Sequence, residues 1–226
     1  MALDLHLLLV TPLEVVKRLF TLVTEGGFWR TLFFSFSRIV LGFLLAFLSG
    51  CLLGVLSGKW KLLEILLWPY VITIKTVPVA SFIILSLIFF SARQLPTFIS
   101  FLMVFPVIYS NVLEGIRSTD KELLEMAQVF RMPWLRRLGY IYLPHLKPLL
   151  FSACSVALGM SWKSGVAAEV IGVASGSIGE KLYESKVYFL TSDLLAWTVV
   201  IVVISVLFEK LFLRLMKAAF DRWEAR

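Results

Sequence analysis

Three ionisable residues lie within, or near the end of, long apolar stretches of the sequence: Lys75, Lys163 and Glu169. An unpaired charge in hydrocarbon costs at least about 2.5–3.5 kcal/mol, so each side chain must face water, a solute or an opposite charge. Lys163 shares a helical stripe with Ser155 and Gly159, and small or polar stripes face protein or water rather than lipid. Two interpretations stay open: the three residues line a solute pathway, or Glu169 forms a structural ion pair with a lysine.

Other residue types offer no catalytic or metal-binding set. The two histidines, His6 and His145, are far apart, and the two cysteines, Cys51 and Cys154, sit inside apolar runs. The glycine-containing string at residues 54–60 lacks both the spacing and the Ser/Thr of a phosphate-binding P-loop. We therefore expect no metal, no bound cofactor and no catalytic activity in this chain.

The composition indicates a membrane protein. Of the 226 residues, 59% are hydrophobic and 16% are charged, whereas soluble domains are about 45–50% apolar and about 25% charged. These values exclude a soluble enzyme domain and intrinsic disorder. The net charge of +7 has no soluble basic face to carry it, so we expect contact with a lipid bilayer and not with nucleic acid.

Apolar stretches divide the chain into membrane spans of the required length, about 20 residues each. The expected spans are residues 32–57, 66–91, 95–116, 148–171 and 194–213. We therefore predict an all-α integral membrane protein in which residues 1–226 form one five-span helical bundle. Arg38 lies near the end of the first span, where a long side chain reaches the interface.

The segment 11–25 is too polar to span and is predicted to be an amphipathic helix lying in the membrane interface. Thr11 and Glu14 have the spacing of a capping box, and Pro12 falls at the first helical position.

The first span carries one small residue at every fourth position. These residues are Gly42, Ala46, Gly50, Gly54 and Gly58. Repeated small residues at this spacing form a ridge that lets a second helix approach closely, so we predict that this span packs tightly inside the bundle.

Lysine and arginine are distributed unevenly between the two sides of the predicted bundle. Thirteen lie on the side of residues 58–65, 117–147 and the C-terminal tail, and six lie on the other side. Because cytoplasmic loops are enriched in these residues, we expect the 117–147 loop and the C-terminus in the cytoplasm and the N-terminus outside. Residues 1–10 lack the features of a secretory signal peptide.

The 117–147 loop is predicted to form two short helices. Thr119 and Glu122 have capping-box spacing, so the first helix is expected to begin near Asp120. The second is expected to run from Trp134 to Leu143 and to end at Pro144. The apolar residues expected on one face are Met126, Phe130 and Trp134. Such a face can fill a groove on a partner protein.

This loop resembles the cytoplasmic EAA signature of ABC importer permeases, which reads E-A-A, three residues, G, nine residues, I-x-L-P. The matching positions are Glu125, Ala127, Ile141, Leu143 and Pro144. Met126 and Arg131 stand where the signature has Ala and Gly, so Pro133 is expected to supply the break between the helices. From residue 12 to residue 223 the layout is similar to the nitrate/sulfonate/taurine subfamily, whose members usually have an additional span before the interfacial helix.

The resemblance implies a function. In that family two permeases form the pore of a type I importer, two cytoplasmic ATPase subunits bind the EAA loops, and an external solute-binding protein delivers the solute. The coupling residues implied here are Glu125, Ala127, Phe130, Arg131, Ile141, Leu143 and Pro144. We expect a multi-pass permease of a prokaryotic plasma (inner) membrane, forming a homodimer of permeases, with a small organic or inorganic anion as solute and ATP hydrolysis in a partner subunit.

Two other classes of protein remain as alternatives. A stand-alone channel or an ion-coupled carrier is the first, although carriers usually show internal repeats and a carboxylate at the membrane midplane, and no repeat is visible here. A membrane-embedded enzyme is the second, and it would need the acid–base or metal set that the sequence lacks.

Overall fold

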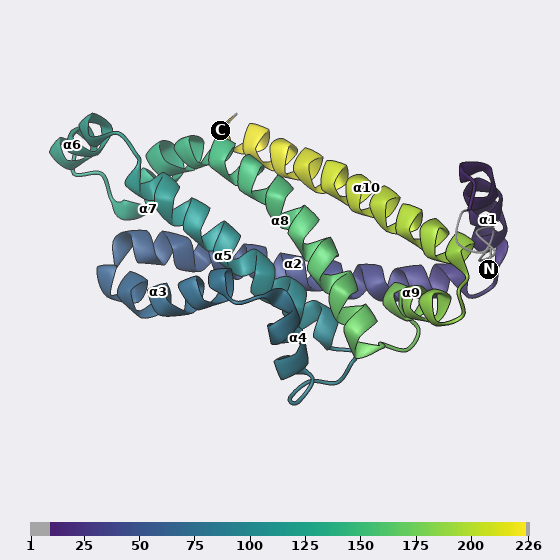
Figure 1. The fold of residues 1–226 in the computed structure, drawn as a ribbon. Coiled ribbons are helices and arrows are strands. Elements are labelled where there is room, and N and C mark those ends of the chain that lie inside the picture. Colours follow the sequence, from purple (N-terminus) through teal and green to yellow (C-terminus); the bar gives the residue numbers. More distant parts are fainter. Residues whose placement is uncertain (1–9, 225–226) are drawn as a thin grey trace.

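In the computed structural model, which describes residues 10–224, the chain folds into α-helices and one π-helical turn, with no strand in that range (Figure 1). The helices are α1 (Pro12–Thr24), α2 (Phe28–Lys59), α3 (Lys61–Thr76), α4 (Val79–Ser86), α5 (Leu95–Arg117), α6 (Lys121–Val129), α7 (Trp134–Arg137), α8 (Leu143–Gly172), α9 (Ile178–Val187) and α10 (Thr191–Glu224). The signal-peptide prediction concerns residues 1–10, of which 1–9 lie outside the described range, as does Arg226.

The predicted all-helical membrane fold is confirmed. Among the described residues, four helices are long and apolar enough to cross a membrane: α2, α5, the continuous helix Trp134–Gly172, and α10 as far as Trp223. Helices α3 and α4 pass the same test only as a pair that is bent by 104°, and counting this pair as one span gives five.

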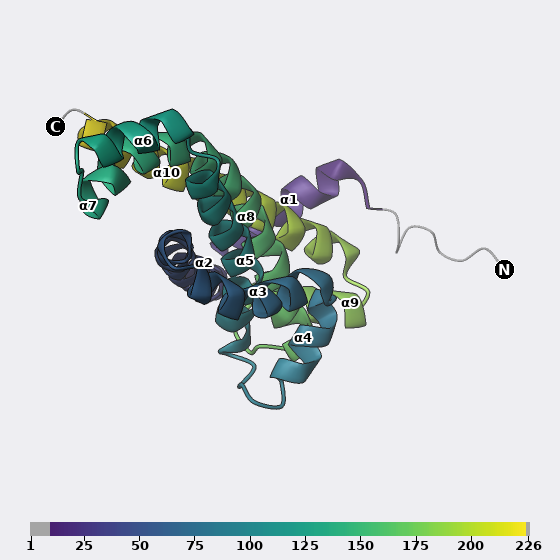
Figure 2. The ribbon, with the colours of Figure 1, turned by 90° about the vertical axis from the view of Figure 1, so that its left-hand side faces the viewer.

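The predicted span at residues 66–91 is therefore a broken one. Val77 takes an extended backbone conformation, with φ −78° and ψ 132°, because the ring of Pro78 disfavours a helical conformation for the residue before it. Helix α4 then begins at Val79 in a new direction. Figure 2 shows α4 and the loop after it at the edge of the bundle.

Helix α5 lies at the centre of the bundle, packed against α2 and α8 (Figures 1 and 2). The small-residue ridge of α2 is the surface that contacts α5. A Cβ atom added to Gly42 would lie 2.4 Å from the backbone oxygen of Thr97, and one added to Gly54 would lie 2.8 Å from the Val112 side chain. A Cβ atom added to Gly50 would lie 3.0 Å from the Ile108 side chain, and one added to Gly58 would lie 2.8 Å from the Ile116 side chain. Ala46 is fully buried.

The helix expected to end at Pro144 instead continues through it, so that prediction is wrong. Proline has no N–H, and its ring displaces the carbonyl of the residue four positions earlier, which is Tyr140. The chain accommodates this with a π-helical turn at Leu138–Tyr142, in which the N–H of Leu143 donates to the carbonyl of Leu138. Helices α7 and α8 and the π-helical turn between them therefore form one continuous helix, Trp134–Gly172.

Helix α1 begins with the predicted capping box, which is confirmed. The N–H of Glu14 donates to Thr11 Oγ1 at 3.4 Å, and the N–H of Thr11 donates to Glu14 Oε2 at 3.0 Å. Arg18 forms a bidentate ion pair with Asp193 at the start of α10 and a second pair with Glu25. The hydrogen bond to Asp193 raises the pKa of Arg18 further above its ordinary range, so the guanidinium that links α1 to α10 stays protonated at every physiological pH. The interfacial position of α1 remains a prediction.

Candidate functional site

Helices α6 and α7 lie at one end of the molecule, beside the C-terminal end of α10 and the turn from α2 to α3, while α1 and α9 lie at the opposite end (Figure 1). Helix α6 begins as predicted near Asp120, but Asp120 itself is the capping residue, since its carboxylate accepts from the N–H of Glu122 at 3.0 Å. Thr119 is buried and donates to the carbonyl of Gly115 at 3.0 Å. The proposed Thr119–Glu122 capping box is therefore wrong.

The turn between α6 and α7 depends on Arg131. This residue occupies the glycine position of the signature and has φ +47°, a left-handed conformation that glycine adopts most easily. The N–H of Arg131 donates to the carbonyl of Gln128, and the N–H of Met132 donates to the carbonyl of Ala127, both at 2.9 Å. These two bonds are those of a Schellman helix end. Arg131, and not Pro133, makes the break.

A second arginine, which the sequence analysis missed, fixes the turn from the other side. Arg137 Nε donates to the carbonyl of Met132 at 2.8 Å, and Nη2 donates to the carbonyl of Ala127 at 3.4 Å. Its position one helical turn after Pro133, in a loop rich in free carbonyls, is the only sequence signal for this role. The loop is therefore held in one conformation by its own residues.

The structure separates the signature residues into two groups. Ala127 is fully buried and Ile141 is 8% exposed, so both support the loop from inside. Glu125, Phe130, Arg131 and Pro144 are exposed, and Leu143 is partly buried. Only the exposed residues are available to a partner protein.

An apolar knob stands on this end of the molecule, formed by Met126, Val129, Phe130 and Leu135. The exposed fractions are 45% for Met126, 79% for Val129, 75% for Phe130 and 79% for Leu135. Val129 and Leu135 were not singled out from the sequence, although Val129 follows Met126 at helical spacing. Exposed apolar patches mark surfaces that contact a partner protein or a membrane.

The loop is also connected to the spans. The Lys59 ammonium at the end of α2 lies 5.7 Å from the ring centroid of Trp134, and that ring is 5.4 Å from the ring of Tyr142. At Gly139 an added Cβ would come within 3.0 Å of Trp223 in α10. Packed side chains therefore connect α7 and the π-helical turn after it to α2 and α10.

Neither of the two lysines meets Glu169. Lys75 is exposed in the last turn of α3, donates to Ser110 Oγ at 2.7 Å, and lines a cavity of about 200 Å³ that also contains Glu114 and Arg117. Lys163 is exposed on the face of α8 that no other described helix covers. Within residues 10–224 no ion pair joins either lysine to Glu169, so the structure does not bring the three candidate residues together.

Glu169 is fully buried and holds the start of α9 in place. Its Oε2 accepts from Ser35 Oγ at 2.8 Å and from the N–H of Gly179 at 3.1 Å, and Ser35 Oγ accepts from the N–H of Ile178 at 2.9 Å. One carboxylate and one hydroxyl thus join α2, α8 and the N-terminus of α9. The partners expected for Glu169 were lysines, and Ser35 and Gly179 were not predicted because they are distant from each other along the chain.

No group of His, Cys, Asp and Glu side chains suitable for a metal ion occurs in the part of the chain that the structure describes. The arrangement presents instead a hydrogen-bonded turn between α6 and α7 at one end and, at the other end, α9 held by hydrogen bonds to Glu169 and Ser35.

Comparison with known proteins adds independent information. The model of the family described as "Binding-protein-dependent transport system inner membrane component" matches residues 39–226. A Bacillus subtilis (strain 168) permease protein named for aliphatic sulfonates transport is 29% identical over 217 residues, which cover 95% of this chain and 78% of that protein. The taurine transport system permease protein of Escherichia coli (strain K12) is 26% identical over 223 residues, covering 96% and 80%. The bicarbonate transport system permease protein of Synechococcus elongatus is 26% identical over 187 residues, covering 82% and 67%.

Proposed function

This chain belongs to the family of binding-protein-dependent transport system inner membrane components, and from this membership we propose how its parts carry out import. The protein is a multi-pass membrane permease subunit of an ABC importer. This identification favours the importer over a channel, an ion-coupled carrier or a membrane-embedded enzyme. We propose that a separate ATPase subunit hydrolyses ATP, that an external solute-binding protein supplies the solute, and that two copies of this permease form the pore.

The observation that carries the coupling proposal is the apolar knob on α6 and α7. Val129 and Phe130 are both more than 70% exposed, and Arg131 and Arg137 hold the turn that presents them. Large apolar side chains that are rigidly presented become anchors when a partner buries them. The ATPase subunit is the partner that the family implies.

For the pathway we propose that Lys163 lines it and that the solute is a small anion. Lys163 is exposed on α8, in the helix Trp134–Gly172 that is long and apolar enough to cross a membrane, and an exposed ammonium is stable there only when it faces water or an anion. The relatives' names refer to sulfonates, taurine and bicarbonate, which include small anions. Lys75, hydrogen bonded to Ser110, is proposed as a second lining residue, and Glu169 as a residue that positions α9.

Replacing Lys163 by methionine is expected to reduce transport by about tenfold, which corresponds to about 1.4 kcal/mol of lost interaction with an anion. Methionine keeps the length and apolar character of the side chain, so assembly with the ATPase subunit and basal ATP hydrolysis should be retained. Lys61→Met, which removes an exposed lysine at the start of α3, is the control. Solute uptake and ATP hydrolysis by the complex in proteoliposomes give the answer, and equal loss of both activities would show that Lys163 is structural.

We also propose that α6, α7 and the C-terminus are cytoplasmic and that α9 is external. The uneven distribution of lysine and arginine supports this orientation. It also agrees with the position of α6 and α7 at the end of the bundle opposite α1 and α9 (Figure 1).

Cysteine labelling tests the orientation. In a variant with Cys51 and Cys154 replaced by alanine, a cysteine at the exposed position Lys186 of α9 is expected to react with a membrane-impermeant maleimide in intact cells. A cysteine at Lys121, exposed at the start of α6, should react only after permeabilisation, because the bilayer excludes the reagent from the cytoplasm. The reverse pattern would invert the proposed topology.

A further inference from the structure

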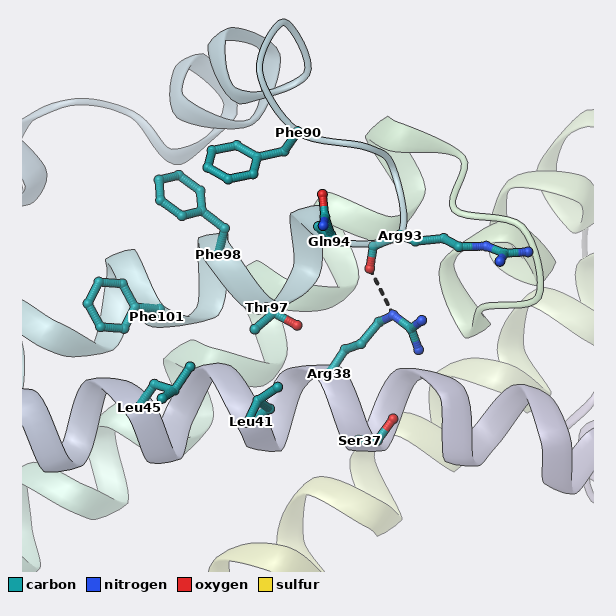
Figure 3. Close-up of a pocket in the computed structure, with 10 residues that line it drawn as sticks. All are labelled: Ser37, Arg38, Leu41, Leu45, Phe90, Arg93, Gln94, Thr97, Phe98 and Phe101. Atoms are coloured by element: carbon teal, nitrogen blue, oxygen red, sulfur yellow. Dashed lines mark hydrogen bonds between the residues drawn. The ribbon is translucent and has the colours of Figure 1, made fainter.

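A cavity of about 720 Å³ opens between α2, the loop after α4 and the first turns of α5 (Figure 3). One end of it is polar, with Ser37, Arg38, Gln94 and Thr97 together and the backbone of Arg93 beside them. Helices α6 and α7 lie far from this cavity (Figure 1), and neither Lys75 nor Lys163 lines it.

The other end of the cavity is apolar. Leu41 and Leu45 follow Arg38 along one face of α2, and Phe98 and Phe101 follow Thr97 along the facing side of α5 (Figure 3). Leu41 is 51% exposed and Leu45 is 47% exposed, so the apolar end is open at the surface of the spans. The cavity therefore changes from polar to apolar along the direction of the helices.

The lengths of the helices place the boundary between the polar and apolar ends of the cavity at a membrane interface. At about 1.5 Å per residue, Arg38 lies about 31 Å along α2 from Lys59, where that helix ends. The hydrocarbon core of a bilayer is about 30 Å thick. When Lys59 lies at one interface, Arg38 lies at the other, and Leu41 and Leu45 lie progressively deeper in the hydrocarbon. The short distance of Thr97 from the start of α5 agrees with this depth.

Arg38 is held where it can bind an anion. Its Nε donates to the backbone oxygen of Arg93 at 2.8 Å, Nη1 donates to the carbonyl of Phe34 at 3.2 Å, and the guanidinium lies 3.5 Å from the centroid of the Phe34 ring. Within the described part of the chain, Nη2 donates to no acceptor. Arg93 is exposed and adds a second positive charge, and the buried carboxyl group of Glu169 also lies near Arg38.

We propose that this cavity binds an anionic phospholipid, with the phosphate at Arg38 and Arg93 and one acyl chain along Leu41, Leu45, Phe98 and Phe101. A small soluble anion would use only the polar end and would leave most of the 720 Å³ unfilled. A phospholipid matches both ends, the charge of the two arginines and the depth of the change in polarity. It would also connect α2 to the loop between α4 and α5, which Arg38 already contacts through one backbone bond.

The test uses the purified complex of permease and ATPase subunits in detergent, with native mass spectrometry to count bound lipids. Phosphatidylglycerol and phosphatidylethanolamine with the same acyl chains are added in turn. We expect the complex to retain phosphatidylglycerol preferentially. Arg93→Gln should reduce this preference about fivefold, as removal of one basic residue near a membrane surface does, and the fold should survive because only the backbone of Arg93 holds Arg38.

A second pair of variants tests whether an acyl chain occupies the apolar end of the cavity. Leu45→Trp fills the apolar end and should reduce the occupancy of both lipids, whereas Leu48→Trp, on the same helix but outside the cavity, should leave it unchanged. Equal binding of the two lipids, with no effect of Arg93→Gln, would overturn the proposal. So would displacement of phosphatidylglycerol by inorganic phosphate, which indicates a soluble anion, or a disulfide between two Leu45→Cys permeases, which indicates that a second copy covers the cavity.

Discussion

Replacing Val129 and Phe130 together by aspartate is expected to abolish copurification of the ATPase subunit and ATP-driven uptake, while the permease still inserts and folds. Both side chains are more than 70% exposed, so neither contributes much to the packing of the permease itself. If each is an anchor worth about 2 kcal/mol or more in the assembled importer, their joint loss weakens binding by about a thousandfold.

The control for this variant is Lys121→Asp with Gln128→Asp. These residues are also exposed on α6, but they lie away from the side of the helix that carries Val129, so the control adds negative charge without removing the knob. Pull-down of the ATPase subunit by tagged permease, together with the elution profile of the permease, separates lost docking from lost folding. Unchanged pull-down by the Val129/Phe130 variant would place the ATPase contact elsewhere.

The loop shows which parts of a site can be read from a sequence. Spacing predicted two short helices within residues 117–147, and the role proposed for them rests on the resemblance of Glu125 and the end of the loop to the EAA signature. The same resemblance implied Ala127 as a coupling residue, but the structure buries it. Aspartate at Ala127 would disturb the loop from inside, so it cannot distinguish docking from folding.

The turn at Arg131 was not predictable for a different reason. An arginine in the left-handed conformation is unfavourable by roughly 1–2 kcal/mol, so local propensity favours another solution, such as a break at Pro133. The two Schellman bonds and the contacts of Arg137 with Met132 and Ala127 offset that cost. These contacts depend on how the second helix folds back, which local sequence does not specify.

The positions of the membrane spans could be predicted from the sequence, but their directions and contacts could not. Hydropathy locates apolar segments well, because transfer into lipid depends on composition, and the positions of α2, α5, α8 and α10 follow from it. Hydropathy carries no information on direction, so the 104° bend between α3 and α4 was visible only as a proline at position 78. The partner of Glu169 was equally hidden, since Ser35 and Gly179 approach it only after three helices have packed.

Replacing Gly42 by alanine is expected to destabilise the permease strongly, whereas the same change at Gly159 should be tolerated. An added Cβ at Gly42 would lie 2.4 Å from the Thr97 backbone oxygen and 2.9 Å from the Ser100 Cβ, while nothing lies within 4 Å of the corresponding position at Gly159. Alanine favours a helix by about 1 kcal/mol over glycine at both sites, so that contribution cancels in the comparison. What remains is the clash with α5, for which overpacking costs of typically 1–3 kcal/mol are expected.

The measurement is the midpoint temperature at which the detergent-solubilised permease loses its monodisperse elution peak. Gly42→Ala is expected to lose its peak roughly 2–10 °C below Gly159→Ala, and leucine at position 42 should leave no folded permease. Gly159→Ala should lie about 2–4 °C above the parent protein, because alanine favours a helix by about 1 kcal/mol over glycine and meets no neighbour at that site. Equal midpoints for the two alanine variants would mean that α2 and α5 separate easily. That result would be difficult to reconcile with the position of Ser100. Its Cβ would lie 2.9 Å from a Cβ added to Gly42, and its hydroxyl donates to the carbonyl of Ser161 in α8 at 3.0 Å. A shift of α2 against α5 would therefore move α8 as well.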